Sequence, residues 1–362
     1  MGKKEHPCDQ FLVKSRIRPV FPRKGMTVQE LVENFNNSGA FNGGRLGQAC
    51  RLYEKMINEN CTIAWTLSGA MTPTGFGGTL IELMKAGFID MIISTGANLY
   101  HDLHFALDLP VHQGDFRVDD NMLWKSNLSR IYDIFISDEL LLSTDDYIIK
   151  TLDRSGIEGN VPTSKLHQVL GAGLWDTAPH PEISVVAWAE KLGIPVFCPS
   201  PGDSSIGMNM ASMKLKGGTL TIDSDMDVLD LTAVIQYSDM NAVVIVGGGA
   251  PKNFYLQTQP TLWQIFQLNE GGHDYFIQMT SDAPHWGGLS GATPNEAISW
   301  GKVKADEVDN HVVVYSDATI AAPILAANAL DRCEPRPQRN LLDRLPELVE
   351  RLRKDVDKGI LS

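Results

Sequence analysis

The sequence predicts an α/β fold with a mostly parallel sheet, and three observations predict it. Short apolar runs rich in Val and Ile alternate along the chain with helical patterns, which is typical of parallel strands joined by crossover helices. Most of these runs end in Gly, Ser, Thr or Asp, as strands do where the chain leaves a sheet. No linker divides the 362 residues cleanly, so we expect a single domain over residues 26–362. Residues 1–25 are expected to be an N-terminal extension, because termini are often loosely held.

Six apolar runs are expected to form the strands of the sheet. Each is short and is bounded by turn-forming residues, which favours a buried strand over a helix. In chain order the expected strands are Thr62–Leu67, Met91–Thr95, Pro195–Pro199, Ala242–Val246, Tyr275–Thr280 and Val312–Tyr315.

Start and stop signals predict helices between the strands. Thr27 and Glu30 have the spacing of a capping box, in which two side chains satisfy the first backbone N–H groups of a helix. Prolines that open helices and a glycine that ends one predict further elements. These are a helix over Glu182–Leu192 between Pro181 and Gly193, a helix that begins at Asp225, and a final amphipathic helix over Glu347–Asp357 after Pro346.

Two segments are expected to be irregular. Gly43–Gly47 is rich in glycine and does not fit a nucleotide-binding fingerprint, so we interpret it as a turn. Asp108–Asn127 shows little hydrophobic periodicity, which indicates loops.

The composition is ordinary for a globular protein with a sizeable core, and it argues against several other classes. A net charge of −13 and a pI of about 5.1 argue against a nucleic-acid binder, which needs a basic surface. The same charge suits a cationic substrate such as a polyamine, although many soluble enzymes are acidic only for solubility. No apolar run approaches the roughly 18 residues of a membrane helix, and no secretory signal is expected. The cysteines form no CxxC pair and the histidines show no ligand spacing, so we expect a cytoplasmic protein without a disulfide framework or a metal.

Small residues, often beside an acid, follow five of the expected strands. In open α/β sheets, ligands bind beyond the carboxyl ends of strands, where small residues let backbone amides approach phosphates and a carboxylate can hold ribose hydroxyls. One glycine cluster alone is explained by a tight turn, but five such ends together predict a dinucleotide pocket, although the usual GxGxxG is missing. The five ends are Gly96-Ala97-Asn98, Ser200–Ser205 with Asp203, Gly247-Gly248-Gly249, Ser281-Asp282 and Ser316-Asp317-Ala318.

One lysine has neighbours that could make it a nucleophile. Lys302 follows Trp300 and lies near apolar residues, so partial desolvation would lower its pKa and free the amine to attack a carbonyl or imine. Glu296 could bind an ammonium group or pass a proton. The alternative is an ordinary surface lysine, because lysines are mostly exposed, and a Trp300 that only packs in the core.

A glycine-rich loop holds a second pair of candidate residues. His285 and Trp286 lie just before Gly287 and Gly288, and loops of this kind often carry function. The alternative is that His285 only shapes the turn.

Several segments together resemble the deoxyhypusine synthase family. The most specific is Ala292–Val303, with the sequence ATPNEAISWGKV, which is similar to the family's segment around its imine-forming lysine. The Gly247-Gly248-Gly249 strand end, Val314–Ala318 and Ile194–Pro199 also match. A looser match runs from Gly75 to Asp102.

The resemblance implies a doubly wound, Rossmann-like fold with helices on both faces, which binds NAD. It also implies a homotetramer with active sites between paired subunits. In the implied reaction NAD oxidises the carbon beside a polyamine nitrogen, Lys302 captures the four-carbon unit as an imine, and an acceptor amine displaces the lysine before the retained hydride reduces the product. The donor would be spermidine, and the acceptor a lysine of the translation factor that becomes hypusinated, or putrescine in the homospermidine synthases derived from the family.

The resemblance also assigns roles to positions of this sequence. Glu296 and Lys302 are the catalytic candidates, and Trp300 and Asn253, at the position of a family histidine, are substrate-binding candidates. His285, which the glycine-rich loop rather than the resemblance singles out, is the third substrate-binding candidate. The positions where the family contacts NAD are Thr95, Gly96, Asp203, Gly247, Gly248, Gly249, Ser281, Asp282, Ser290, Asp317 and Ala318, of which Ser281 and Asp282 are not the family's usual residues.

Five positions depart from the family pattern. Asn253 stands in place of a histidine, Leu289 and Met208 each in place of an acidic residue, and Tyr100 and His101 in place of paired glutamates. Each lost charge-assisted hydrogen bond to an ammonium group weakens binding by about 1.5–3 kcal/mol. The donor, the acceptor or both are therefore expected to differ from the family norm.

Three hypotheses follow from the sequence. The first is an NAD-dependent aminobutyl transferase that acts on polyamines (spermidine or putrescine), with a small amine acceptor slightly favoured over a protein lysine. The second is an NAD-dependent amine or alcohol dehydrogenase in which Lys302 only binds substrate. The third is a regulator that binds NAD without catalysis.

Overall fold

The core of the protein is a six-stranded parallel sheet. The computed structural model describes residues 15–268, 271–305 and 308–360, and the strand order is β11-β10-β9-β1-β2-β7. All six expected strands are present, and each boundary lies within two residues of its expected position, which confirms the α/β prediction. The strands are β1 (Thr62–Leu67), β2 (Met91–Ser94), β7 (Val196–Phe197), β9 (Asn241–Val246), β10 (Tyr275–Thr280) and β11 (His311–Tyr315).

The strand order is that of a doubly wound fold with one switch point. The chain runs outward from β1 through β2 to β7, then returns to the other side of β1 and continues through β9, β10 and β11. At the carboxyl edge of the sheet, Leu67 of β1 lies opposite Val246 of β9. Doubly wound sheets bind ligands at this reversal, because the two crossovers leave in opposite directions and open a crevice.

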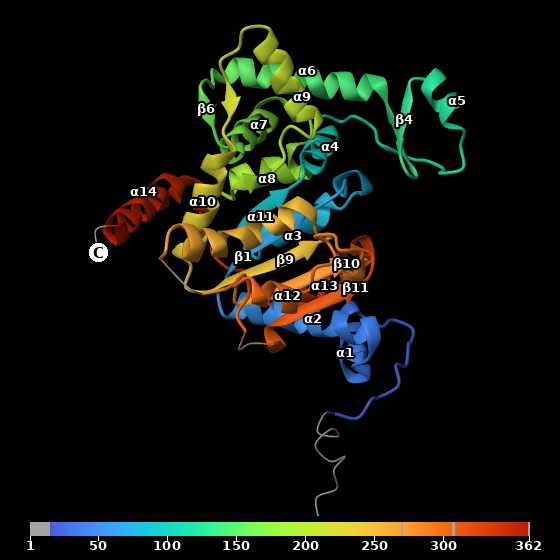
Figure 1. Cartoon of the computed structure of the whole chain (residues 1–362). Helices are drawn as coiled ribbons and strands as arrows, with labels where there is room; N and C mark the ends of the chain where they lie inside the picture. The colour runs from blue at the N-terminus through green and yellow to red at the C-terminus, as the bar shows by residue number, and fades with distance from the viewer. Residues whose placement is uncertain (1–14, 269–270, 306–307, 361–362) are drawn as a thin grey trace, which may run out of the picture.

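Helices cover both faces of the sheet, as Figure 1 shows. Alternate residues of β1 point to opposite sides, so Trp65 and Leu67 join one core while Ala64 joins the other. The first core also includes α1 (Val28–Ser38), α2 (Phe41–Asn58), α3 (Gly77–Lys85) and α13 (Ala318–Arg332); the second includes α10 (Ser224–Gln236), α11 (Gly249–Pro260), α12 (Pro294–Ser299) and α14 (Leu341–Ile360).

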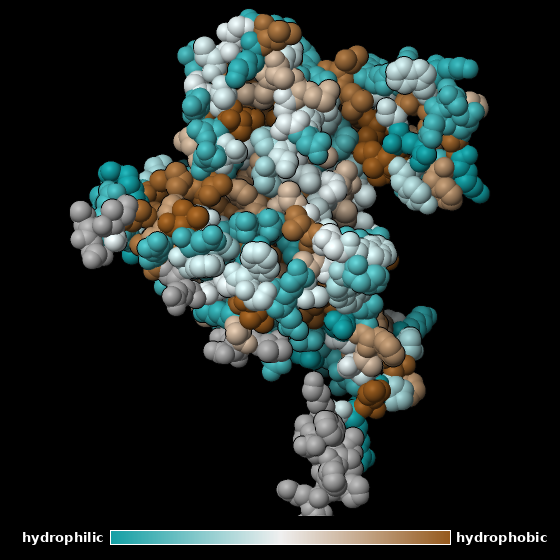
Figure 2. Space-filling view, viewed as in Figure 1, coloured by the Kyte–Doolittle hydropathy of each residue, from teal (hydrophilic) through white to brown (hydrophobic). Residues whose placement is uncertain are grey.

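A helical layer lies above the sheet in Figure 1, and an arm projects from it. The face of this arm that Figure 2 shows is mostly hydrophilic, although Phe116, Trp124 and Tyr132 of the arm are exposed. The layer contains α4 (Gly96–Ala106), α6 (Asp138–Ser155), α7 (Thr163–Thr177), α8 (Val185–Lys191), α9 (Ser205–Leu215), β6 (Asn160–Val161) and β8 (Thr221–Ile222). The arm consists of β3 (His112–Gln113), α5 (Asp120–Lys125), β4 (Leu128–Ile131) and β5 (Ile134–Ser137).

The expected loop over Asp108–Asn127 is therefore wrong in part. Strand β3 and helix α5 both lie within it, and the Asp119 side chain caps α5 by accepting from the Asn121 N–H at 2.8 Å. These elements are too short to produce a periodic apolar pattern, and β3 is defined by its antiparallel pairing with β5.

Helix starts follow the expected signals with three corrections. The capping box is present, since Glu30 N–H donates to Thr27 Oγ1 and Thr27 N–H donates to Glu30 Oε2. Asp223, not Asp225, caps α10. Pro181 opens a 3₁₀ turn rather than the helix, and the Ser184 hydroxyl caps a shorter α8. Helix α14 begins at Leu341 and continues through Pro346, because its buried leucine face packs in the second core.

The expected turn over Gly43–Gly47 is wrong, because the segment lies inside α2. A side chain on Gly44 would overlap the backbone of Gly39, and one on Gly47 would overlap Asn36. These glycines thus let α1 and α2 pack at close distance, which local propensity does not report.

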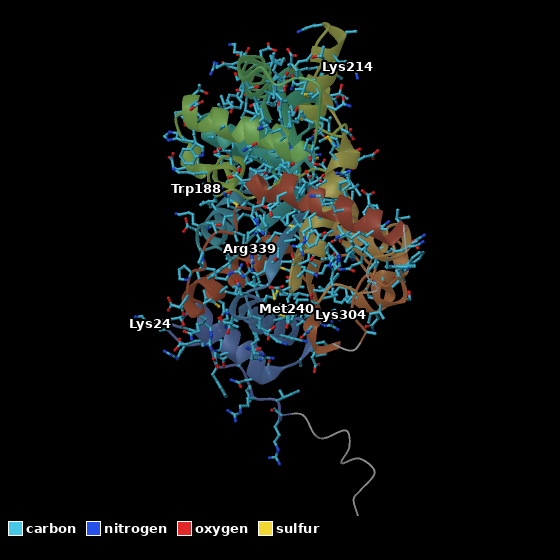
Figure 3. The ribbon with its side chains drawn as sticks, turned by 90° about the vertical axis from the view of Figure 1, so that its left-hand side faces the viewer. Lys24, Trp188, Lys214, Met240, Lys304 and Arg339 are labelled. Atoms are coloured by element: carbon cyan, nitrogen blue, oxygen red, sulfur yellow. The ribbon has the colours of Figure 1, made fainter. Side chains whose placement is uncertain are left out.

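Buried ion pairs lie at the amino edge of the sheet, at the opposite end of the strands from the switch point. Asp90, which precedes β2, lies 3.2 Å from a guanidinium nitrogen of Arg336 and 3.2 Å from one of Arg339. Figure 3 labels Arg339 and Met240 on this edge. Among the residues that the structure describes, no helix has the length and hydrophobicity that a membrane crossing requires.

Candidate functional site

The triple glycine forms the turn at the switch point. Gly248 N–H donates to Ser68 Oγ at 2.9 Å, and Gly249 N–H donates to Ser290 Oγ at 3.1 Å. Gly247 has a φ of +75°, and a side chain there would overlap Ser68, so only glycine fits. This turn leads from the carboxyl end of β9 directly into α11, whose N-terminus carries a partial positive charge.

A second helix start lies at the same carboxyl edge. Thr95 caps α4 by accepting from Asn98 N–H at 3.3 Å, and its hydroxyl donates to Gly69 O at 2.7 Å. A side chain on Gly96 would overlap Ser204, so the caps of α4 and α9 are in contact. The structure thus brings Thr95 and Gly96 next to the segment that contains Asp203, which is exposed.

The remaining cofactor candidates follow β10 and β11 along the same edge. Asp282 N–H donates to Thr280 Oγ1 at 3.1 Å, directly after β10, and Ser281 is exposed. Asp317 caps α13 by accepting from Thr319 N–H at 2.7 Å, and Ala318 is buried as the first residue of that helix.

These residues fit a dinucleotide such as NAD. A glycine turn without side chains lies at the start of α11, so a pyrophosphate can approach the backbone closely there. The exposed Asp203 follows β7 and the exposed Asp317 follows β11, so a carboxylate that could hold ribose hydroxyls lies at each outer strand of this carboxyl edge. Among the described residues, no group of three or more His, Cys, Asp or Glu side chains could hold a metal ion.

Lys302 lies in a half-buried position after α12. Its Nζ donates to Asn253 Oδ1 of α11 at 3.1 Å and lies 5.7 Å from the centre of the Trp300 ring. Burial lowers the pKa of Lys302 below the ordinary value of 10.5, and the Glu296 carboxylate partly opposes that shift. The side chain is therefore not an ordinary surface lysine, and its partner is a neutral amide rather than a carboxylate.

The segment around Lys302 is held by backbone contacts. Thr293 caps α12 by accepting from Glu296 N–H at 3.3 Å. His273 N–H donates to Lys302 O at 3.0 Å, ahead of β10. The lysine thus approaches from beside α11 rather than from a strand end, while Glu296 and Trp300 remain exposed.

A second lysine, which sequence reasoning missed, connects this segment to the glycine turn. Lys252 is only 2% exposed, and its Nζ donates to Gln278 Oε1 at 3.0 Å and to Ala292 O at 2.6 Å. Gln278 Nε2 in turn donates to the carbonyls of Gly247 and Ser290, each at 2.7 Å. Burial lowers the pKa of Lys252 to about 8; Glu296 raises it and Lys302 lowers it further. The only signal in the sequence was a lysine one residue before Asn253.

The glycine-rich loop after β10 does not close over the lysine in the single chain. His285 and Trp286 lie on a 3₁₀ turn with ring centres 5.8 Å apart, and Trp286 is 69% exposed. Leu289 and Met208 are exposed as well. The predicted substrate-binding role of His285 therefore has no contact to Lys302 among the described residues to support it.

Two of the departures lie on α4 and bond within the helical layer. The Tyr100 hydroxyl donates to Asp145 at 2.9 Å and to Leu141 O at 3.0 Å, both on α6. His101 and His104 of α4 share a hydrogen bond of 2.9 Å, and burial lowers the pKa of His101 to about 4, so its ring is neutral. Tyr100 thus fastens α4 to α6, and neither side chain offers a negative charge to an ammonium group.

The fold and the site together define a class of protein. This is a doubly wound α/β protein with a nucleotide-type glycine turn at the switch point and a half-buried lysine beside it.

Comparison with known proteins shows the family. The family model for deoxyhypusine synthase matches residues 30–329. A deoxyhypusine synthase-like protein of Nostoc punctiforme is 41% identical over 350 residues, which cover 94% of this chain and 89% of that protein. A protein of Methanosarcina acetivorans named probable deoxyhypusine synthase 2 is 38% identical over 304 residues, or 84% of this chain and 86% of that protein. The chain therefore belongs to the deoxyhypusine synthase family, which implies an enzyme of the transferase class and confirms the resemblance.

A solved structure supports the fold. A crystal structure of an Entamoeba histolytica protein described as a deoxyhypusine synthase has a TM-score of 0.58 at 18% sequence identity, and covers 87% of this chain and 96% of that chain. At this identity the likeness shows the shared architecture alone.

Proposed function

We propose that this protein catalyses the NAD-dependent transfer of a 4-aminobutyl group from a polyamine to an acceptor amine through an imine on Lys302. The observation that carries the proposal is the environment of the Lys302 amine. It is half-buried, its pKa is lowered, and it donates to the neutral Asn253 amide. A carboxylate in place of Asn253 would hold the proton on the amine, whereas the amide lets the proton leave and so favours a nucleophile.

The cofactor would be held along the carboxyl edge. Gly247, Gly248 and Gly249 would receive the pyrophosphate at the start of α11, and Asp203 and Asp317 would be available to ribose hydroxyls. Bound NAD supplies hydride acceptance from the carbon beside the substrate nitrogen and later returns the hydride to the product imine.

The residues of the chain have separate tasks in this reaction. Lys302 adds its amine to the oxidised carbon, and the departing amine takes a proton, which Glu296 is close enough to the lysine to supply. The acceptor amine then attacks the same carbon and the lysine leaves. Trp300, exposed beside the lysine, is available to the substrate cation through its ring face.

The assembly we infer is a homotetramer with active sites between paired subunits, in the cytoplasm. The exposed Trp286, Leu289, Met208 and Trp300 support it, because large apolar side chains around a candidate site usually mark an interface or a ligand. For the acceptor, a small amine such as putrescine, which would give homospermidine, is favoured over a protein lysine. The support is the altered pocket at Asn253, Leu289 and Met208.

The proposal is tested by trapping the imine. Incubation with NAD and labelled spermidine or putrescine, followed by borohydride, should leave a stable adduct on Lys302 that peptide mass spectrometry locates. Lys302→Arg should bind NAD as the wild type does and form neither adduct nor product. Lys304→Arg is the matched control, because Lys304 lies two residues away and pairs with Asp274 instead. NADH formation without any adduct would replace the proposal by an amine dehydrogenase.

A further inference from the structure

The helix that carries Asn253 ends in an unusual way. Helix α11 ends at Pro260, and Thr261–Ile265 continues as a π-helical turn, in which Phe266 N–H donates to Thr261 O at 2.9 Å. Pro260 has no N–H to donate, so the regular ladder of the helix is interrupted just before this turn. π-turns are rare and less favourable than α-helix, and they are found frequently at functional sites.

The π-turn directs one indole onto the lysine segment. Leu262 is fully buried in the core, whereas Trp263 remains 39% exposed. A Cβ atom on Gly301 would lie 3.1 Å from Trp263 Nε1 and 3.7 Å from its Cδ1. The Trp263 ring therefore covers Gly301, whose φ of +64° also requires glycine.

Gly301 lies between the two residues that define the amine site. Trp300 precedes it and is 62% exposed, and Lys302 follows it. Trp263, on the π-turn, therefore contacts Gly301, which lies between the exposed Trp300 and Lys302. In the described part of the chain the indole N–H of Trp263 has no hydrogen-bond acceptor, so the ring is not fixed by a polar contact of its own.

The charges near Lys302 favour an uncharged aromatic surface for binding the cationic amine substrate. Lys252 and Lys302 both lie close enough to Glu296 for its carboxylate to raise their pKa values. One carboxylate shared by two lysines leaves little negative charge for the ammonium group of a substrate. Indole faces attract alkylammonium cations through the ring quadrupole and bury the attached methylenes, without adding a charge.

We propose that Trp263 is a specificity-determining residue of the amine site, and that its ring forms with Trp300 the aromatic wall against which the alkylammonium chain of the substrate lies. This inference rests on the proposed function, since it assigns the amine substrate to the segment around Lys302. It concerns binding of the amine and not the imine chemistry itself.

The test compares substitutions on the same turn by direct binding. Trp263→Leu should weaken the binding of spermidine and putrescine to the NAD-loaded protein about tenfold by calorimetry, and Trp263→Phe should keep most of the affinity. Ile265→Ala is the matched control, because Ile265 is 65% exposed on the same π-turn. It should bind both amines as the wild type does. NAD affinity, melting temperature and the mass in solution should stay unchanged in all three variants.

Each outcome decides between the proposals. Wild-type affinity in Trp263→Leu would overturn the role of Trp263, as would a loss of affinity shared by Ile265→Ala. A change in solution mass or NAD affinity would show that Trp263 serves the interface or the fold instead. If the wild type binds spermidine but borohydride traps nothing on Lys302, the proposed group transfer is wrong. The binding measurements on the Trp263 and Ile265 variants still test the role of Trp263 in that case. If the wild type binds neither amine, both proposals are wrong.

Discussion

At the scale of single residues, the candidate site depends on the burial and the hydrogen-bond partners of two lysines. Lys252 is buried and satisfied by Gln278 and a backbone carbonyl, whereas Lys302 is half-buried and donates to the neutral amide of Asn253. The first arrangement holds the lysine segment to the glycine turn, and the second leaves an amine that can shed its proton. The two lysines therefore have different roles, because their hydrogen-bond partners differ.

The lowered pKa of Lys302 predicts a pH profile. The uncharged amine reacts, so acylation of Lys302 by a small reagent should accelerate as pH rises, with a midpoint below the ordinary lysine value of 10.5. Glu296→Gln should move the midpoint further down, because the carboxylate favours the charged amine. Peptide mass spectrometry from about pH 6 to about pH 11 measures both midpoints against a free lysine model compound. A midpoint at or above that of the model compound would contradict the assigned environment.

At the scale of elements, helix starts and turns place the site, and glycines permit the close approaches. The capping box of α1 and the caps of α4 and α13 follow from local side-chain chemistry. The glycines of α2 do not, because their role is a contact with α1. Local chemistry does not explain the role of the π-turn after α11 either, because its Trp263 contacts Gly301, 38 residues later in the chain.

The two adjacent glycines of α2 give a matched pair of substitutions. Gly44→Ala should lower the free energy of unfolding by about 1–3 kcal/mol, because the new methyl group overlaps the Gly39 backbone. Gly43→Ala should raise it by up to about 1 kcal/mol through helix propensity, because its methyl group would lie 3.5 Å from the Phe35 ring, an ordinary contact. Urea unfolding of both variants measures the difference. Equal effects would show that α1 and α2 are not packed as described.

At the scale of the whole molecule, the doubly wound order brings the candidate residues to one edge of the sheet. The strand ends, the glycine turn and the lysine segment meet beside β9 and β10, while Asp90 and its two arginines lie at the amino edge. The exposed Trp286, Leu289 and Trp300 around the candidate site fit our proposal that a second copy of the chain completes it.

That proposal predicts how the assembly responds to surface changes. Light scattering of the wild type should give four times the chain mass of 39.8 kDa. The double variant Trp286→Ser, Leu289→Ser should form smaller species and bind NAD more weakly, because it removes apolar surface beside the site. Leu215→Ser, on an exposed position at the end of α9, is the control and should leave the mass unchanged. If only the control variant dissociates, the interface lies elsewhere.

The sequence by itself determined the six strands, their small-residue ends, the capping box and the segment that contains Lys302. All of these are set by residues within a few positions of one another, so local patterns report them. Only the tertiary structure decided the bond from Lys302 to Asn253, the bridge from Lys252 through Gln278 to the glycine turn, and the indole of Trp263 over Gly301. It also bonded Tyr100 to α6 and His101 to His104 of the same helix, and placed Gly43–Gly47 within a helix. The physical reason is that burial and side-chain partners come from elements far apart in the chain, and these set the protonation of a lysine and the need for a glycine.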